Sequence, residues 1–110
     1  MPDPEVLVQR QLDAYNARDL EAFLECFSEE VCLCELHDNS PIAEGKPAMR
    51  ALYKNLFENS PNLHAALLNR IVQDQVVVDH EEVRGLRAET ERAVAIYRVE
   101  EGQIHHVWFA

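Results

Sequence analysis

The sequence predicts a single α+β domain over residues 1–110, in which a curved, mostly antiparallel sheet wraps around three helices. Two observations support this prediction. Apolar residues recur at helical spacing through most of residues 1–60, whereas the rest of the chain consists of strand-like runs in two pairs, each joined by a short turn. The expected order of elements is α-α-β-α-β-β-β-β. At 110 residues the chain is long enough for one domain with its own core and too short for two.

Two helices are expected at the start of the chain. Asp3 is suited to cap the first helix, because Pro4 follows it at a position where a helix tolerates proline. Spacings of i, i+4 and i+7 give this helix one apolar face, formed by Val8, Leu12 and Tyr15. Residues 16–18 end the helix. Asp19 can cap a second, short helix, whose apolar residues are Leu20, Phe23, Leu24 and Phe27.

A strand and a third helix are expected next. Residues 31–36 alternate between the two faces of a strand, and residues 37–45 are expected to form a polar loop. Pro47 then begins the helix with the clearest apolar periodicity in the chain, and residues 59–61, Asn-Ser-Pro, end it. The apolar face of this helix is formed by Met49, Leu52, Tyr53, Leu56 and Phe57.

The second half of the chain is expected to form two hairpins. Residues 63–73 and 76–86 are joined by a two-residue turn, and residues 92–99 and 103–109 are joined through a turn that contains a glycine. A long sheet with helices on one face curls around them, and three helices cannot fill the mouth of the resulting cone. A pocket at this mouth is therefore the expected binding site.

The composition disfavours several classes of function. Twenty acidic and ten basic residues give a net charge of −10, which disfavours binding to nucleic acid or to an anionic membrane. The N-terminal segment lacks the basic and apolar regions of a secretory signal, and no run approaches the ~20 apolar residues of a membrane span. Cys26, Cys32 and Cys34 are expected to be reduced, since neighbours on one strand face lie about 7 Å apart. We therefore expect a cytoplasmic location.

The common motifs of nucleotide-binding and hydrolytic sites are missing from the sequence. It has no glycine-rich phosphate-binding loop, and none of its serines lies in a nucleophile elbow. Asp79, His80, His105 and His106 are conceivable metal ligands, but their spacing matches no metal motif. We therefore expect neither a metal nor an organic cofactor.

Glu35 is the most informative candidate for catalysis. Alternation places it on the same strand face as Val31 and Leu33, which should face the helices. A carboxylate on an apolar face is costly unless it is neutralised, so its pKa should be raised, which suits a general base or acid. In the alternative interpretation, Glu35 lies in solvent at the end of the strand or pairs with an arginine.

The register of the first hairpin distributes the polar residues between its two faces. A two-residue turn pairs Arg70 with Asp79 and Asn69 with His80. We expect Asn69 and His80 to face the helices, where His80 is either a donor in the pocket or a core residue with satisfied hydrogen bonds.

The outer face of the sheet is expected to bind a second copy of the chain. The last strand carries apolar residues on both faces, so its outer face needs a cover, and a second subunit is the simplest one. The alternative is a solvated sheet face. The residues predicted at or near the homodimer interface are Arg70, Asp79, Glu81, His106 and Trp108.

Three segments together resemble the nuclear transport factor 2-like superfamily, and within it the SnoaL-like and ketosteroid-isomerase-like proteins. They are AYNARDLEAFLECFSEEV at 14–31, GKPAMRALYKNLF at 45–57 and VAIYRVEEGQIHHVWF at 94–109. The resemblance implies a cystatin-like cone whose interior is the pocket, and a dimer formed through the outer face of the sheet. It also implies that the proton-shuttling base of the ketosteroid isomerases falls on Glu35. The positions of the two oxyanion donors of those enzymes, a tyrosine and a protonated aspartate, correspond to Gln11 and Ala95, so this sequence has neither donor at its usual position.

Three functions are consistent with this interpretation. In the first, the protein is a cofactor-free isomerase or cyclase in which Glu35 abstracts a proton next to a carbonyl. A nearby donor stabilises the enolate, from Tyr15, Tyr53, Tyr97 or His80. In the second, it binds a small apolar or carbonyl-containing ligand without catalysis. In the third, it is a dimeric interaction domain without a ligand. The residues predicted to line the pocket are Met49, Tyr53, Phe57, Asn69, Tyr97, Val107 and Phe109.

Overall fold

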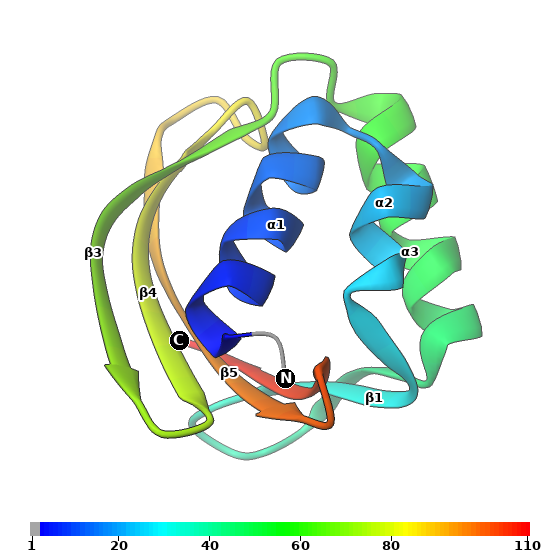
Figure 1. Cartoon of the computed structure of the whole chain (residues 1–110). Coiled ribbons are helices and arrows are strands. Elements are labelled where there is room, and N and C mark those ends of the chain that lie inside the picture. Colours follow the sequence, from blue (N-terminus) through cyan, green and yellow to red (C-terminus); the bar gives the residue numbers. More distant parts are fainter. Residues whose placement is uncertain (1–2) are drawn as a thin grey trace.

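The fold consists of helices held on the concave side of one curved sheet (Figure 1). The structure, a computed structural model, describes residues 3–110. Its elements in chain order are α1 (Pro4–Ala17), α2 (Leu20–Glu25), β1 (Phe27–Glu35), β2 (Pro41–Glu44), α3 (Lys46–Asn59), β3 (His64–Gln73), β4 (Val76–Arg84), β5 (Glu91–Glu100) and β6 (Gln103–Phe109). No helix within the described residues is long and apolar enough to cross a membrane.

The first two helices begin at the residues predicted to cap them. The Asp3 side chain accepts a hydrogen bond from the Glu5 backbone N–H at 2.8 Å, and the Asp19 side chain accepts one from the Ala22 backbone N–H. At the end of α1, the Asn16 amide donates to the Ala65 carbonyl at 2.9 Å and accepts from the Ala65 N–H at 2.8 Å. These two bonds fix the end of α1 against β3, and with it the direction in which the helix crosses the sheet.

The sheet has the strand order β2-β1-β6-β5-β4-β3, in which β1 and β6 are parallel and all other neighbours are antiparallel. The short strand β2 corrects the prediction of a loop over residues 37–45. Its polar sequence gave no alternating pattern, and Pro41 is tolerated because it is the first residue of an edge strand. Strand β1 also begins at Phe27 instead of Val31, so α2 is shorter than predicted.

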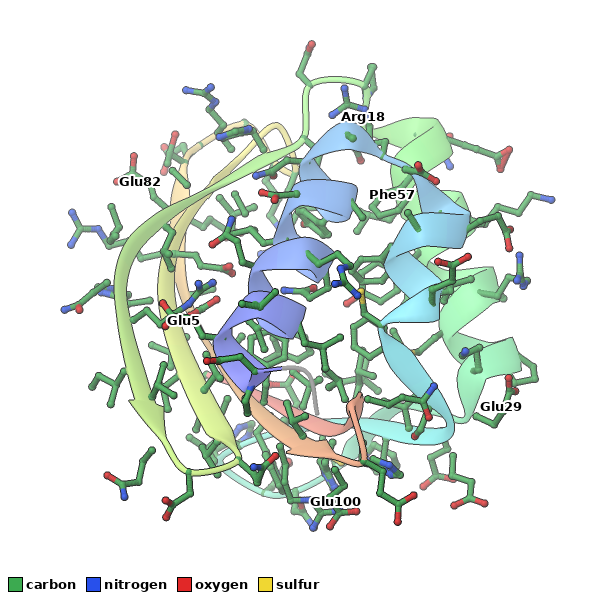
Figure 2. The ribbon with its side chains drawn as sticks, viewed as in Figure 1. Glu5, Arg18, Glu29, Phe57, Glu82 and Glu100 are labelled. Carbon is green, nitrogen blue, oxygen red and sulfur yellow. The ribbon has the colours of Figure 1, made fainter. Side chains whose placement is uncertain are left out.

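The helices lie at different places along the curved sheet. Strands β3 to β5 bend around α1, while α2 and α3 lie beyond α1 on the side of β1 (Figure 1). An aromatic cluster fills the space between the helices: the ring centroids of Phe23 and Tyr53 lie 4.6 Å apart, and those of Tyr15 and Phe57 lie 5.6 Å apart. Three of the four acidic side chains labelled in Figure 2, Glu29, Glu82 and Glu100, lie on the periphery.

The β3–β4 hairpin has the predicted register but the opposite assignment of faces. Arg70 pairs with Asp79 and Asn69 with His80, as expected. However, Asp79 is fully buried towards the helices, whereas Asn69 is exposed and His80 is half-buried on the outer face. Apolar residues are divided evenly between the two faces of β4, so alternation alone could not identify the inner one. The face of β4 that carries Asp79 can be buried because Arg70 pairs with the Asp79 carboxylate and compensates its charge.

This inversion also corrects the predicted subunit interface. Arg70, Asp79 and Glu81 face the helices and cannot contribute to the outer face. His106 and Trp108 do lie on the outer face, since they alternate with residues of β6 that point inward. The strand register aligns an apolar row across this face, formed by Ile71, Val78, Ile96 and Trp108.

Candidate functional site

A cavity of about 460 Å³ opens between the helices and the concave face of the sheet. This volume lies within the range of natural small-molecule sites. All three helices and five of the six strands contribute side chains. The lining residues are mostly apolar, and the polar ones among them are Gln11, Tyr15, Tyr53, Glu81, Arg87 and Tyr97.

The mouth of the cavity is lined by apolar side chains and by the guanidinium of Arg87. Ile42, Leu52 and Leu86 line the cavity and are each about 40 % exposed, at 41 %, 39 % and 40 %. Arg87 lies beside them in the loop after β4, where its guanidinium pairs with Glu91 at 3.0 Å. A ligand that enters here passes apolar side chains before it reaches the polar groups inside.

Glu81 is the titratable group at the centre of the site. It lies on the inner face of β4, its residue surface is 8 % exposed, and no group within residues 3–110 forms a hydrogen bond with its carboxylate. Burial, together with the nearby charge of Asp79, raises its pKa to about 7, although the charge of Arg70 opposes the shift. Near neutral pH the carboxyl group is therefore divided between its acid and base forms, as proton transfer requires.

Three tyrosine hydroxyls share the cavity with Glu81. Burial and the neighbouring carboxylate raise the pKa of Tyr15 to about 12, and burial also raises the pKa of Tyr53 and Tyr97. All three hydroxyls therefore keep their protons at neutral pH and can donate hydrogen bonds. Gln11 donates to the Tyr97 hydroxyl oxygen at 3.1 Å, which leaves the proton of that hydroxyl available to another acceptor.

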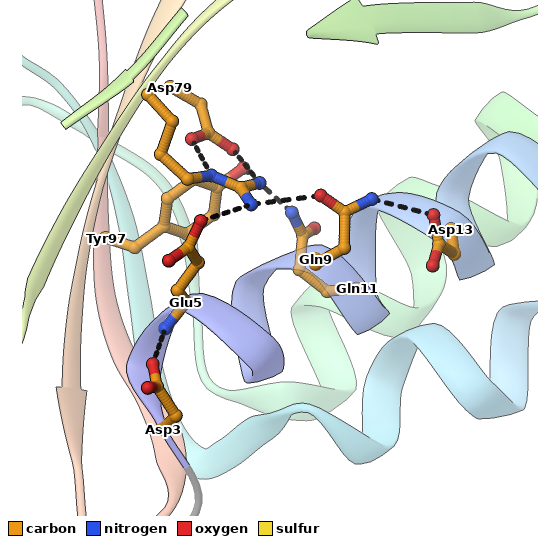
Figure 3. A network of polar contacts seen from close by, with 8 residues as sticks. Asp3, Glu5, Gln9, Gln11, Asp13, Asp79 and Tyr97 are labelled. Atoms are coloured by element: carbon orange, nitrogen blue, oxygen red, sulfur yellow. Dashed lines mark hydrogen bonds and ion pairs between the residues drawn. The ribbon is translucent and has the colours of Figure 1, made fainter. Parts of the chain in front are cut away.

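A buried ion pair lies behind the site. The Arg70 guanidinium forms two hydrogen bonds with the Asp79 carboxylate, at 2.7 and 2.9 Å, although the side chain of Asp79 is 0 % exposed. From α1, the Gln9 amide oxygen accepts from the same guanidinium at 2.9 Å, and Glu5 lies 3.8 Å away (Figure 3). Arg70 is thus fully engaged, so the charge of Asp79 is satisfied while that of Glu81, two residues further along β4, is not.

The structure brings together five of the predicted site residues. Tyr15, Tyr53, Tyr97, Val107 and Phe109 all line the cavity. Their predicted roles in binding or catalysis stay predictions.

The other predicted site residues lie elsewhere. Met49 and Phe57 are buried in the core between the helices and do not line the cavity. Asn69 and His80 lie outside it because the hairpin presents its opposite face to the helices. Glu35 ends β1 half-buried, where its N–H donates to the Ser40 carbonyl, and it is not among the lining residues. Its role as a base stays a prediction.

Sequence reasoning placed Glu81 at the subunit interface and so missed it as a site residue. The available sign was that Val77 and Val83 flank Asp79 and Glu81 on the same face of β4, and the structure buries all four. A single strand could not show which of two comparable faces meets the helices. Gln11 lies in the cavity at the position where the resemblance places an oxyanion donor, while Ala95 is buried opposite Asp79.

Comparisons with known proteins identify the family of this cone. A family model described as a SnoaL-like domain matches residues 8–107. No curated protein matches the chain. Among solved structures, an uncharacterised cystatin-fold protein from Novosphingobium aromaticivorans has a TM-score of 0.91 at 22 % identity, with 100 % of this chain and 99 % of that chain covered.

Two further structures have the same fold at lower identity. A candidate polyketide cyclase from Sinorhizobium meliloti has a TM-score of 0.81 at 16 % identity, covering 100 % of this chain and 95 % of that chain. TerC, co-crystallised with polyporic acid, has a TM-score of 0.79 at 13 % identity, covering 98 % and 91 %. At such identities these structures establish the fold alone. The family match over residues 8–107 shows that the chain belongs to the SnoaL-like family.

Proposed function

We propose that the cavity binds a small, largely apolar molecule that carries a carbonyl group, and that Glu81 transfers a proton on this molecule. The observation that carries the proposal is the position of the Glu81 carboxyl group, which is buried among apolar side chains without a hydrogen-bond partner in the described part of the chain. A carboxylate in such surroundings is costly to maintain, and proton transfer is a use that repays this cost.

The proposed reaction begins with Glu81 as a carboxylate. It takes a proton from a carbon next to the carbonyl, and the electron pair of the broken C–H bond moves towards oxygen to form an enolate. A tyrosine hydroxyl stabilises the enolate oxygen by donating a hydrogen bond, which the raised pKa values of the tyrosines make available. When the ligand carries a C=C bond next to the deprotonated carbon, the enolate is conjugated with it, and protonated Glu81 returns the proton to the far carbon of that bond as the double bond moves next to the carbonyl, so the net reaction is an isomerisation.

Tyr97 is the best-placed donor among the three tyrosines. Its hydroxyl oxygen already accepts a hydrogen bond from Gln11, which orients it, and its ring is buried on the strand next to β4. In this proposal Gln11 is a positioning residue at the site where the family resemblance places an oxyanion donor.

Ligand binding without catalysis is the second candidate. The predominance of apolar side chains along the cavity supports it, because such a lining binds apolar molecules whether or not a reaction follows. The relative crystallised with polyporic acid supports a ligand in this fold and suggests a probe. A ligand-free interaction domain is the least favoured candidate, since it calls for a packed cone, and the cone here contains a cavity of about 460 Å³.

Two measurements test the proposal. Binding of polyporic acid, followed by quenching of protein fluorescence, tests whether the chain accepts the compound with which a protein of the same fold was crystallised. Exchange of the α-protons of a bound cyclic ketone in heavy water, followed by NMR, tests proton transfer. We expect Glu81→Gln to reduce the exchange rate by at least about 100-fold, which is within the usual range for a general base.

Matched variants make the outcome specific. Glu82→Gln changes the neighbouring residue of β4, which points away from the cavity, and should leave exchange unchanged. Glu35→Gln should also leave it unchanged, and if this variant alone abolished exchange, Glu35 would be the base instead. If the wild type bound the ligand but did not exchange the α-protons, ligand binding without catalysis would be the function. If it neither bound the ligand nor exchanged the protons, the proposed site would be contradicted.

A further inference from the structure

Three metal-ligating side chains meet on the outer face of the sheet, away from the cavity. Strands β1 and β6 are parallel neighbours, and their register pairs Cys32 with His106. Leu33 and Val107 alternate with these residues and line the cavity, so Cys32, Cys34 and His106 point to the opposite face. The two Sγ atoms lie 3.3 Å apart, and one ligand atom from each of the three residues lies within 4.8 Å of the others.

The imidazole of His106 is held in a fixed plane. It stacks on the Trp108 indole, with ring centroids 3.8 Å apart and an interplanar angle of 8°. The Trp108 Nε1–H in turn donates to the Asn39 side-chain oxygen at 3.2 Å. The Nε2 atom of His106 is buried and has no hydrogen-bond partner within residues 3–110. Buried polar atoms are rarely left unsatisfied, so this nitrogen indicates a missing partner.

We propose that Cys32, Cys34 and His106 bind a Zn²⁺ ion. Two thiolates and one imidazole form a donor set that zinc favours, and three protein ligands leave a fourth position of the tetrahedron for water or a carboxylate. Glu44 is the cross-strand neighbour of Cys32 in the register of β1 and β2, but its carboxylate is not among the ligand atoms that lie within 4.8 Å of one another. This proposal does not depend on the proposed function of the cavity, and it departs from the expectation that the chain binds no metal.

The geometry is close to what zinc requires. With Zn–S bonds of about 2.3 Å, two thiolates of a tetrahedral site lie about 3.8 Å apart. The observed 3.3 Å therefore has to increase by about 0.5 Å. A disulfide is the poorer alternative, because the two cysteines lie two residues apart on an extended strand, about 7 Å between their Cα atoms.

The surrounding charges suit a dication. Two thiolates neutralise the ion, and the strand register places Glu44 opposite Cys32 and Arg98 opposite His106. These two side chains offset each other. The ion would join β1 to β6 at the point where the sheet has its one parallel pairing.

The test uses the full chain, reduced and freed of metal with a chelator. Zinc is then titrated in competition with a chromophoric chelator, and Co²⁺ is added separately to reveal thiolate-to-metal charge transfer. We expect one ion per chain and a charge-transfer band. Loss of a residue that only holds a metal ligand in place weakens metal binding by about 10–100-fold. Loss of a ligand itself, in Cys32→Ser or His106→Gln, should therefore weaken zinc binding by at least about 100-fold.

The control is Cys26→Ser, which removes the buried third thiol at the end of α2 and should leave the affinity unchanged. Cys34→Ala repeats the ligand test if another variant fails to fold, as judged by circular dichroism. The proposal is overturned if the reduced wild type binds no zinc at micromolar concentration, if zinc binds without a cobalt charge-transfer band, or if the ligand variants bind as tightly as the control.

Discussion

Asp79 and Glu81 lie two residues apart on the same face of β4, yet their surroundings differ. Asp79 accepts two hydrogen bonds from Arg70, whereas the Glu81 carboxylate has no such partner among the described residues. The same strand therefore holds one carboxylate that is paired with a guanidinium and one whose pKa is raised to about 7. This contrast is the basis for assigning a structural role to the first and a chemical role to the second.

Replacing Glu81 should make stability less dependent on pH. The native state keeps the Glu81 proton up to about pH 7, whereas the unfolded chain releases it near pH 4.5. Between these values the native state binds more protons, so the stability of the wild type falls as the pH rises. Glu81→Gln removes this loss, and it should gain up to about 3 kcal/mol relative to the wild type between pH 4.5 and pH 8.

Urea unfolding across this pH range measures the difference. Glu82→Gln is the matched control, because Glu82 lies on the outer face of the same strand and should follow the wild type. Parallel stability curves for wild type and Glu81→Gln would show that Glu81 is not buried as an acid.

The ion pair between Arg70 and Asp79 should contribute to stability mainly through the cost of breaking it. Arg70→Met leaves the Asp79 carboxylate buried without its partner, and we expect a loss of about 3–5 kcal/mol. The double variant Arg70→Met with Asp79→Leu should recover most of this loss, since it buries no charge. Arg92→Met is the control: its 3.8 Å pair with Glu82 is exposed, and its loss should cost less than about 1 kcal/mol. Equal losses from Arg70→Met and Arg92→Met in urea unfolding would contradict this account.

At the scale of the elements, the loop after β4 depends on one glycine. Gly85 has a φ of +80°, and a Cβ at this position would overlap the backbone carbonyl of Asn62. Gly45 also has a positive φ, of +84°, but a Cβ there would meet its neighbours at an ordinary 3.7 Å. Gly45→Ala should therefore cost about 1–3 kcal/mol of backbone strain, and Gly85→Ala should cost at least about 1 kcal/mol more. Thermal unfolding of both variants checks the order, and the reverse order would mean that the loop adjusts freely.

Most elements could be predicted from the sequence because their patterns are local. Asp3 and Asp19 are followed by helical periodicity, and the two-residue turn of the β3–β4 hairpin sets its register. Strand β2 could not be predicted, since an edge strand of four residues needs only one partner and leaves no alternation in the sequence. The inner face of β4 could not be predicted either, because which face is buried depends on how α1 packs on the finished sheet.

The same limit explains what was predicted of the site. Tyr15 and Tyr53 follow from helical faces, which a sequence defines well, and both line the cavity. The position of Glu81, inside or outside, depends on which face of β4 is buried. From the sequence alone, an acidic residue two positions from another acidic residue is expected to lie at the surface. The three-dimensional arrangement, in which Arg70 is fully engaged by Asp79 and α1, makes the burial of Glu81 evident.

For the whole molecule, we propose that a second copy of the chain covers the outer face of the sheet. The apolar row across four strands is partly open, and Ile71 in it is 62 % exposed. Ile96→Glu places a charge in the middle of this row and should convert a dimer into a monomer at micromolar concentration. Val6→Glu, at a residue 54 % exposed on α1, is the control and should remain dimeric. Sedimentation velocity distinguishes these outcomes, and a wild type that is monomeric at micromolar concentration would contradict the proposed interface.

We propose above all that the Glu81 carboxyl group in the cavity exchanges a proton near neutral pH. The most direct measurement is an NMR titration of the side-chain carboxyl carbon of Glu81, assigned by its loss in Glu81→Gln. We predict a midpoint near pH 7, well above the ordinary value of 4.5. A midpoint close to 4.5 would mean that Glu81 is an ordinary solvated carboxylate, and it would contradict both the proposed base and the site built around it.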